Sequence, residues 1–253
     1  MIDTREYAGR TAVITGAASG MGLCASRALC AAGATVVMCD VNAAGLEQFA
    51  AEINAAGPGR ALPCVADVRK FADAERAAAL ALEKTGRIDL LVTFAGGYEP
   101  RMRGTLGIPF YEQPIEVIDW GVDVNLKGAI YFARACMPAM VRAKRGVICC
   151  IGSVTGFEGD GNGAMYGTSK SGIYNFVKGL AQAGAPHGVR AFCVAPGPVM
   201  TRPGMANMKT LAGFQAEPSE LVEFILFLAS DACRCITGTT HVMDCGRLSM
   251  KPD

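Results

Sequence analysis

The sequence predicts a doubly wound α/β fold, with a mostly parallel sheet of about seven strands and helices on both faces. Short, nearly continuous apolar runs alternate with longer segments of helical pattern. A parallel sheet that is covered on both faces needs strands of that composition. Strand and helix alternate almost throughout, which favours right-handed crossovers between parallel strands. No linker, repeat or low-complexity segment interrupts the alternation, so residues 1–253 are expected to form one domain.

The predicted elements follow one another along the chain. The first strand reads RTAVITG and the second ATVVMCD, and both consist mostly of apolar residues. The same kind of run recurs in ALPCVAD, IDLLVTFAG, GVICCIGS and VRAFCVAPG, each separated from the next by a longer helical segment. Strands are therefore expected at 10–16, 34–40, 61–67, 88–96, 146–153 and 189–197, and helices at about 20–32, 46–53, 72–85, within 114–143, at 164–184 and ending at 227–231.

The composition excludes several classes of function. Hydrophobic residues make up 51% of the chain and the formal net charge is +1, with acidic and basic residues mixed along the sequence. No basic patch indicates a nucleic-acid partner or a membrane surface. No apolar run approaches the roughly 18 residues that a membrane span requires, and the opening MIDTREYAGR lacks the apolar core of a signal peptide. A cytoplasmic protein is expected.

Eleven cysteines are scattered along the chain without a Cys-x-x-Cys motif. Many lie in apolar runs, such as Cys39 and Cys193, where a reduced cysteine acts as a small buried hydrophobe. Only two histidines are present, so a zinc site is not expected and no metal is predicted. A reducing compartment fits this pattern.

A glycine-rich turn, TGAASGMG, follows the first predicted strand directly. Gly16, Gly20 and Gly22 flank the start of the next helix, with Ser19 and Met21 between them. Such a turn lets the backbone approach a pyrophosphate, while the helix N-terminus offers free N–H donors. The alternative is a tight strand–helix turn without a ligand. Its position after the first strand favours dinucleotide binding.

Asp40 ends the second predicted strand, 18 residues beyond Gly22. A carboxylate there can accept hydrogen bonds from both ribose hydroxyls of an adenosine and would repel a 2′-phosphate. The glycine turn contains no arginine that could bind such a phosphate. Asp40 therefore favours NAD(H) over NADP(H), unless it only starts a turn.

Tyr166 and Lys170 are four residues apart, separated only by small residues. On a helix they are neighbours, which by itself is compatible with an ordinary exposed face. The alternative is a phenol whose proton is loosened by an ammonium group one turn away.

Several motifs in a fixed order closely resemble the short-chain dehydrogenase/reductase family, which has a Rossmann fold. They cover essentially the whole chain, as far as the ITGTTHVMDCG segment, and Ser153 precedes Tyr166 by thirteen residues. The motifs are TGAASGMG, Asp67-Val68, Asn125 in DVNLKG, Ser153 in IGSVTG, Tyr166-x-x-x-Lys170, and Pro196-Gly197 before Val199 and Thr201.

The resemblance implies a catalytic role for four residues. Tyr166 would exchange a proton with a carbonyl or alcohol, and Lys170 would lower the pKa of that phenol, which is ordinarily near 10, and bind the nicotinamide ribose. Ser153 would hydrogen-bond the substrate oxygen. Asn125 would hold a water that connects Lys170 to solvent.

The resemblance also implies a cofactor site, of which Asp67 and Val68 would flank the adenine. The chain departs from the family pattern at Thr93 and Phe94, where two asparagines are usual, and at Phe192, without loss of a catalytic group. The implied cofactor-binding residues are Gly16, Ser19, Gly20, Met21, Gly22, Asp40, Val41, Asp67, Val68, Ala95, Gly96, Tyr166, Lys170, Pro196, Gly197, Val199 and Thr201.

The substrate side is expected in loops near 97–113, 154–164 and 198–216. Arg101 and Arg103 would meet a carboxylate or phosphate on the substrate, the alternative being two solvated arginines. The short segment after Thr201 carries several methionines, which suggests an adaptable apolar cleft. Substrate contacts are expected from Ser153 and these arginines, and from Tyr98, Phe157 and Tyr111 at the mouth.

Together these features predict an NAD-dependent oxidoreductase that interconverts a secondary alcohol and a ketone. A 3-oxoacyl thioester reductase and a non-catalytic NAD-binding sensor or scaffold are the alternatives. The apolar segments 131–140 and 174–182 exceed what one sheet face needs, which suggests a homotetramer or homodimer.

Overall fold

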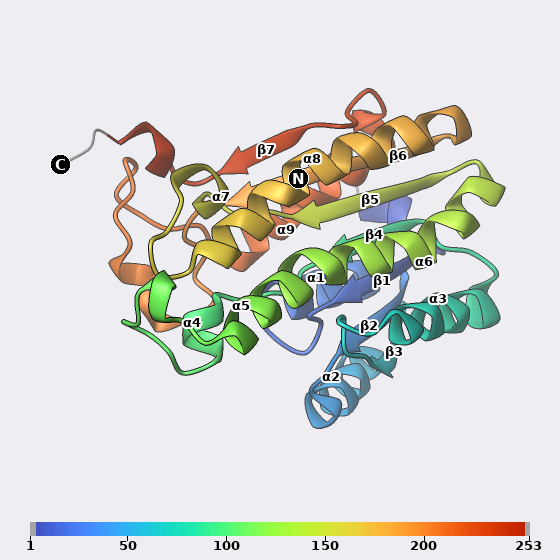
Figure 1. Ribbon diagram of the computed structural model, residues 1–253. Coiled ribbons are helices and arrows are strands. Elements are labelled where there is room, and N and C mark those ends of the chain that lie inside the picture. Colours follow the sequence, from blue (N-terminus) through green and yellow to red (C-terminus); the bar gives the residue numbers. More distant parts are fainter. Residues whose placement is uncertain (1–3, 251–253) are drawn as a thin grey trace.

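Seven strands form one sheet in the computed structural model, which describes residues 4–250 (Figure 1). The strands are β1 (Thr11–Thr15), β2 (Thr35–Asp40), β3 (Arg60–Val65), β4 (Leu90–Thr93), β5 (Gly146–Ile151), β6 (Val189–Pro196) and β7 (Thr240–Met243). Their order is β3-β2-β1-β4-β5-β6-β7, and every neighbouring pair is parallel. The doubly wound fold is confirmed, and the sheet is fully parallel where a mostly parallel one was predicted.

Helices cover both faces of this sheet (Figure 1). Helices α1, α2 and α9 share one buried cluster with the sheet, and α3, α6 and α8 share the other. Neighbouring residues of β1 supply both clusters, since Ile14 points into the first and Val13 into the second; this alternation explains why the strands are apolar throughout. The main helices are α1 (Gly20–Ala31), α2 (Ala43–Ala56), α3 (Phe71–Thr85), α5 (Ile115–Val122), α6 (Gly128–Ala143), α8 (Ala164–Gly184) and α9 (Pro218–Ala229).

Short helical turns occupy several of the connections. Two are α-helical, α4 (Glu99–Met102) and α7 (Thr155–Glu158), and neither was predicted. A π-helical turn, η3 (Asp123–Lys127), joins α5 to α6, so the long region predicted within 114–143 is not one regular helix. The 3₁₀ turns are η1 (Thr4–Tyr7), η2 (Phe110–Glu112), η4 (Ala185–His187), η5 (Pro203–Asn207), η6 (Asp231–Cys233) and η7 (Arg247–Ser249).

Strand β4 is shorter than the predicted strand 88–96. Its last residue is Thr93, because the backbone N–H of Ala95 donates to the Thr15 hydroxyl instead of joining the ladder (3.0 Å between donor and acceptor). Elsewhere the prediction is close, and the predicted helix 164–184 coincides with α8.

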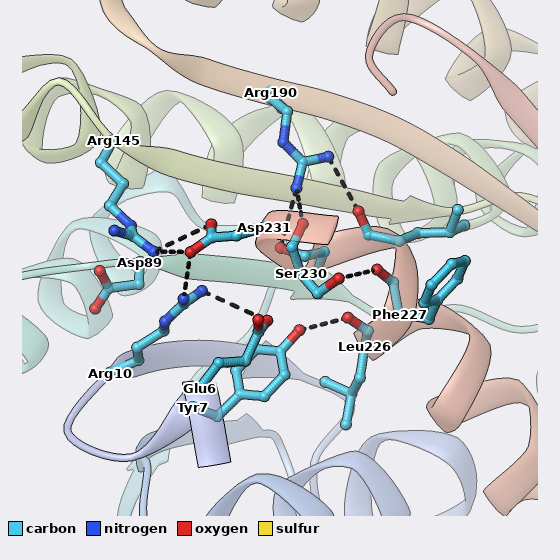
Figure 2. A network of polar contacts seen from close by, with 12 residues as sticks. Glu6, Tyr7, Arg10, Asp89, Arg145, Arg190, Leu226, Phe227, Ser230 and Asp231 are labelled. Atoms are coloured by element: carbon cyan, nitrogen blue, oxygen red, sulfur yellow. Dashed lines mark hydrogen bonds and ion pairs between the residues drawn. The ribbon is translucent and has the colours of Figure 1, made fainter. Parts of the chain in front are cut away.

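A polar network closes the amino end of the sheet (Figure 2). The Arg190 guanidinium on β6 donates to the carbonyl groups of Leu228, Ala229 and Ser230, where α9 ends, and to that of Ile236, each at 3.0 Å. The last carbonyls of a helix have no partner within the helix, so a side chain that binds several of them anchors its end. Nearby, Arg10 and Arg145 both pair with Asp231. These contacts hold the amino end of the sheet together, whereas the longer loops lie at its carboxyl end.

All eleven cysteines are free thiols. Burial agrees with the expectation that most of them pack as small apolar side chains; the exceptions are Cys24 and Cys245, which are partly exposed, and Cys235, which is exposed. The buried ones are Cys30, Cys39, Cys64, Cys136, Cys149, Cys150, Cys193 and Cys233.

Candidate active site

Strands β1 and β4 lie side by side although they are not consecutive, so the strand order reverses between them. At such a switch point the loops at the carboxyl ends of the strands diverge and leave a crevice. Gly16, just after β1, meets the chain that leaves β4. It has a φ of 67°, and a Cβ atom there would lie 2.9 Å from the Ala95 nitrogen. Only glycine allows this close approach.

The glycine-rich turn leads directly into α1. A Cβ on Gly22 would lie 2.2 Å from the Gly16 carbonyl oxygen, so the turn closes on itself only without a side chain. Ser19 precedes the helix and makes no side-chain cap. The first N–H groups of α1 therefore have no partner within the helix and are offered, with the positive end of its dipole, to the crevice.

Asp40 stands at the end of β2, beside this turn. One carboxylate oxygen accepts the N–H of Ala18 at 3.1 Å, and the other accepts the N–H of Asn42 at 3.0 Å. Both bonds orient the carboxylate at the rim of the crevice, where it keeps free lone pairs for a ligand.

Two adjoining cavities occupy the carboxyl edge of the sheet, of about 450 Å³ and 330 Å³. Every cofactor-binding residue inferred from the sequence lines one of them. The larger is lined by Gly16, Ser19, Gly20, Met21, Gly22, Asp40, Val41, Asp67, Val68, Ala95, Gly96 and Thr201, and the smaller by Tyr166, Lys170, Pro196, Gly197 and Val199, with Met21, Gly96 and Thr201 shared between the two.

These residues fit an extended dinucleotide. The larger cavity joins a glycine turn and a free helix N-terminus to a strand-end carboxylate, the groups that bind a pyrophosphate and a ribose. Gly96 lies where the two cavities adjoin, and a Cβ there would lie 3.3 Å from Lys170 Nζ and 2.7 Å from Asn125 Oδ1. A side chain at this position would collide with Asn125 and crowd Lys170.

Ser153, Tyr166 and Lys170 meet in the smaller cavity. Ser153 follows β5, and the other two lie one turn apart on α8. The Ser153 hydroxyl hydrogen-bonds the Tyr166 phenol, and Lys170 Nζ lies 5.5 Å from the centroid of the Tyr166 ring. The three residues are separated in the sequence, and the fold brings their side chains together as one cluster that lines the smaller cavity.

The pKa of the Tyr166 phenol is raised, because burial disfavours the charged phenolate. The hydrogen bond from Ser153 and the positive charges of Arg202 and Arg101 lower it, but by less than burial raises it. The expectation that Lys170 would bring this pKa below its ordinary value is therefore wrong. The loss of water around the hydroxyl outweighs the nearby positive charge.

Lys170 is 4% exposed, and its Nζ donates to the Ile151 carbonyl at 2.8 Å. Burial lowers the pKa of this ammonium to about 8. The group is consequently protonated at pH 7 but loses its proton well before an exposed lysine does.

Asn125 lies in the π-helical turn and is 2% exposed. Its Oδ1 accepts the N–H of Gly97 at 2.8 Å, and its Nδ2 donates to the carbonyls of Gly97 and Gly121, each at 2.9 Å. The side chain thus connects the loop after β4 to the helical region formed by α5 and η3. It lines neither cavity, and neither amide hydrogen remains for the water that the resemblance implies.

Of the predicted substrate residues, Tyr98 and Arg101 line the smaller cavity with Ser153. The Tyr98 ring meets that of Tyr166 edge-on at 6.1 Å between centroids, and its hydroxyl donates to Asp160 Oδ1 at 3.0 Å. The structure thus places Tyr98, Arg101 and Ser153 at the cleft, as predicted.

Three other predictions for the substrate side are wrong in position. Arg103 follows the short α4 turn, is exposed and lines neither cavity. Phe157 stacks on Tyr174 at 4.5 Å between ring centroids and lines neither cavity. Tyr111 is 82% exposed. None of the three lines the cleft.

Several residues that line the two cavities were not predicted from the sequence. Arg202 lines both cavities and follows Thr201 directly, so its neighbour in the motif was the available signal. Trp120 and Met102 line the larger cavity. Of the three methionines near Thr201, Met205 and Met208 line the smaller cavity and Met200 does not.

A buried carboxylate, also unpredicted, lies behind the cluster. Glu99 is 3% exposed, and its Oε1 accepts the N–H groups of Met165 and Tyr166, both at 3.1 Å. Burial raises the pKa of this carboxyl group. No sequence motif marks the position, because the contact joins residues 66 and 67 positions apart.

Within residues 4–250, no three His, Cys, Asp or Glu side chains are arranged to hold a metal ion. The same part of the chain has no helix of sufficient length and apolar character to cross a membrane.

Comparisons with known proteins place these features in context. A family model described as short chain dehydrogenase matches residues 10–211. The chain is 29% identical to a 7alpha-hydroxysteroid dehydrogenase from Bacteroides fragilis, with 95% of each chain covered. It is 34% identical to a cis-4-hydroxycyclohexanecarboxylate dehydrogenase from Sinomonas cyclohexanicum, covering 95% of this chain and 97% of the relative. The crystal structure of a 3-oxoacyl-(acyl-carrier protein) reductase with bound NAD from Brucella melitensis has a TM-score of 0.85 at 30% identity, covering 97% of this chain and 95% of that one.

Proposed function

This chain belongs to the short-chain dehydrogenase/reductase family, and from that premise we propose that it is an NAD-dependent oxidoreductase that interconverts a secondary alcohol and a ketone. One observation carries the proposal. Ser153, Tyr166 and Lys170 meet in a cavity that adjoins a second one built from a glycine turn and a strand-end carboxylate. Relatives named as dehydrogenases of a hydroxysteroid and of a hydroxycyclohexanecarboxylate share the reaction class and differ in substrate.

Tyr166 is the proton donor and acceptor. Its raised pKa keeps the phenol protonated at neutral pH, which is the form that donates a proton to a carbonyl oxygen. Ser153, hydrogen-bonded to that phenol, is placed to donate to the same substrate oxygen as negative charge develops on it. In the oxidative direction the phenolate takes the proton of the alcohol.

Lys170 stabilises the phenolate electrostatically and is held in place by the Ile151 carbonyl. Asn125 is a positioning residue: its side chain holds Gly97 through two hydrogen bonds, next to Gly96 and Lys170. A bound nicotinamide would supply the hydride, and the residues around it supply position and charge.

Asp40 supports a preference for NAD(H) over NADP(H). Its carboxylate is oriented by two backbone N–H groups at the rim of the larger cavity, where a 2′-phosphate would meet negative charge. Arg69 lines the same cavity but is paired with Asp67 through a bidentate contact, which reduces its availability for a phosphate.

A 3-oxoacyl thioester reductase is the second candidate. A solved relative with that name holds NAD, so the choice of cofactor does not separate the two reactions. Reduction of 3-oxobutanoyl-N-acetylcysteamine, compared with a simple ketone of similar size, separates them. A strong preference for the thioester would favour the reductase.

The main test is Tyr166→Phe, after an NADH absorbance screen of steroids, polyols, hydroxy acids and aromatic alcohols has identified a substrate. Loss of the general acid should lower kcat by about 10²–10⁴-fold, with NADH binding retained. Tyr111→Phe is the matched control, because Tyr111 is exposed and away from the cleft. Full turnover by the Tyr166 variant would refute the mechanism, and NADH binding without turnover of any substrate by the unaltered protein would favour a sensor.

The assembly that we propose is a homotetramer, or a homodimer, formed through α6 and α8. Half-buried apolar side chains remain on both helices, among them Tyr131, Met137 and Phe176. Light scattering at micromolar concentration tests this proposal, and a monomer would contradict it.

We propose the cytoplasm as the compartment. Eleven unpaired thiols support a reducing environment, since an oxidising one favours disulfides.

A further inference from the structure

Arg101 and Arg202 lie where the two cavities adjoin, and both line both of them. They come from different loops: Arg101 is in α4, after β4, and Arg202 follows β6 and precedes η5. The fold therefore brings together two guanidinium groups that are about one hundred positions apart in the sequence, next to the Ser153–Tyr166 pair.

Neither guanidinium has a carboxylate partner within residues 4–250, although other arginines of the chain, such as Arg10, Arg69 and Arg87, have one. Burial and the positive charge of Arg202 lower the pKa of Arg101, so the two charges lie close enough to repel each other. Two positive charges at one cavity without a counter-ion repel each other. A bound anion offsets this repulsion, so the cavity favours an anionic ligand.

Two acidic groups lie nearby, and neither forms an ion pair with these arginines. Asp160 lines the smaller cavity, but its Oδ1 accepts from the Tyr98 hydroxyl and from the N–H groups of Asn162 and Gly163. Glu99 is buried, and its Oε1 is bound to the start of α8. Neither carboxylate pairs directly with the arginines, and a negative charge on them disfavours a doubly charged ligand relative to a singly charged one.

The arginines are close enough to the reacting group to act on it, since both of their charges lower the pKa of the Tyr166 phenol. An anion held between them would therefore belong to the same molecule as a carbonyl or hydroxyl at Tyr166. The planar guanidinium fork matches a carboxylate in two parallel hydrogen bonds.

We propose that Arg101 and Arg202 bind the carboxylate of the substrate, so that the protein converts a hydroxy acid and an oxo acid into each other. This inference rests on the proposed oxidoreductase function for the reaction, but the anion site itself is independent of turnover.

The first experiment measures binding without chemistry. Hexanoate and hexanamide, which have no group to oxidise or reduce, are titrated by calorimetry into protein saturated with NADH. Hexanoate should bind at least about tenfold more tightly, the scale of a hydrogen-bonded charge pair. Arg101→Met and Arg202→Met should each abolish most of this preference. Arg103→Met is the matched control, because Arg103 is a neighbour that lines neither cavity.

Equal binding of acid and amide would overturn the proposal. So would an unchanged preference in both variants. If the preference is intact and the variants instead weaken NADH itself, the arginines bind the cofactor phosphates, which also overturns it.

The second experiment measures turnover of oxo acids with the carbonyl two to five carbons from the carboxylate, against their methyl esters. The acid should have the higher kcat/KM for at least one chain length, mainly through KM, and the two arginine variants should remove that advantage by lowering kcat/KM for the acid much more than for the ester. Esters turned over as well as acids, without a binding preference, would overturn this inference and leave the oxidoreductase function standing. A binding preference without turnover of any member would support the anion site and count against the proposed reaction.

Discussion

The Glu99 carboxylate accepts a hydrogen bond from the backbone N–H of Tyr166, at 3.1 Å. The same oxygen accepts the N–H of Met165, so a side chain from α4 satisfies two of the orphan donors at the start of α8. Gly163, which precedes the helix, has no side chain that could cap it. The residue that bears the candidate proton donor is thus positioned by a loop on the opposite side of the cleft.

Glu99→Ala should destabilise the protein by about 1–3 kcal/mol, because it removes the acceptor of the Met165 N–H and leaves the Tyr166 N–H with only the Gly163 carbonyl. Glu99→Gln keeps an acceptor oxygen and should be milder. Urea unfolding measures the effect as a shift of the midpoint at constant m. Glu112→Ala, an exposed carboxylate in the same loop, should change nothing. Equal stability of the Glu99 and Glu112 variants would show that the contact has no role.

Lys170 should make stability depend on pH in a defined window. Burial lowers its pKa to about 8 in the folded protein, whereas an unfolded chain keeps that proton to about 10.4. Between these values the unfolded state binds more protons, so the contribution of Lys170 to stability rises with pH, and below about pH 8 the cost of its buried charge is fully present.

The test is urea unfolding of the unaltered protein and Lys170→Met from pH 7 to 10. The free energy of unfolding of the unaltered protein should gain on the variant by up to about 1.4 kcal/mol per pH unit above pH 8. Lys178→Met, an exposed position on the same helix, controls for loss of a lysine. A constant difference across the range would contradict the buried ammonium.

Asp40→Asn should reduce discrimination between NADH and NADPH. The amide keeps one acceptor for a backbone N–H but lacks the negative charge that repels a 2′-phosphate, so the ratio of the two dissociation constants should fall by about tenfold. Fluorescence titration of both cofactors measures the ratio. Asp119→Asn is the control, since Asp119 is exposed and lines neither cavity. Equal affinity of the unaltered protein for both cofactors would contradict the role of Asp40.

Arg190→Lys should lower the free energy of unfolding by about 1–3 kcal/mol. One ammonium cannot reproduce the four bonds that the guanidinium makes to separate carbonyls around the end of α9. Chemical denaturation measures the loss, and Arg60→Lys, at an exposed strand position, is the comparison. If the two variants unfold at the same denaturant concentration, this network does not stabilise the fold.

The parts of the structure that were predicted are those that follow from local patterns in the amino-acid sequence. Strand–helix alternation predicted the parallel sheet, and helix α8 has the predicted bounds, with buried residues at helical spacing from Gly167 to Gly184. Gly16 and Gly22 could be identified from the sequence because a turn without room for a Cβ atom requires glycine at these positions. The spacing of Tyr166 and Lys170 was likewise sufficient to place them on one helix face.

The amino-acid sequence alone thus determined the fold, the glycine turn and the cluster of Ser153, Tyr166 and Lys170. Only the tertiary structure decided that Arg101 and Arg202 line the same cavities while Arg103 lines neither, and that Glu99 binds the start of α8. The same holds for the raised pKa of Tyr166. Contacts between distant segments and the loss of water around a group depend on how the loops pack together, and no local spacing encodes either of them.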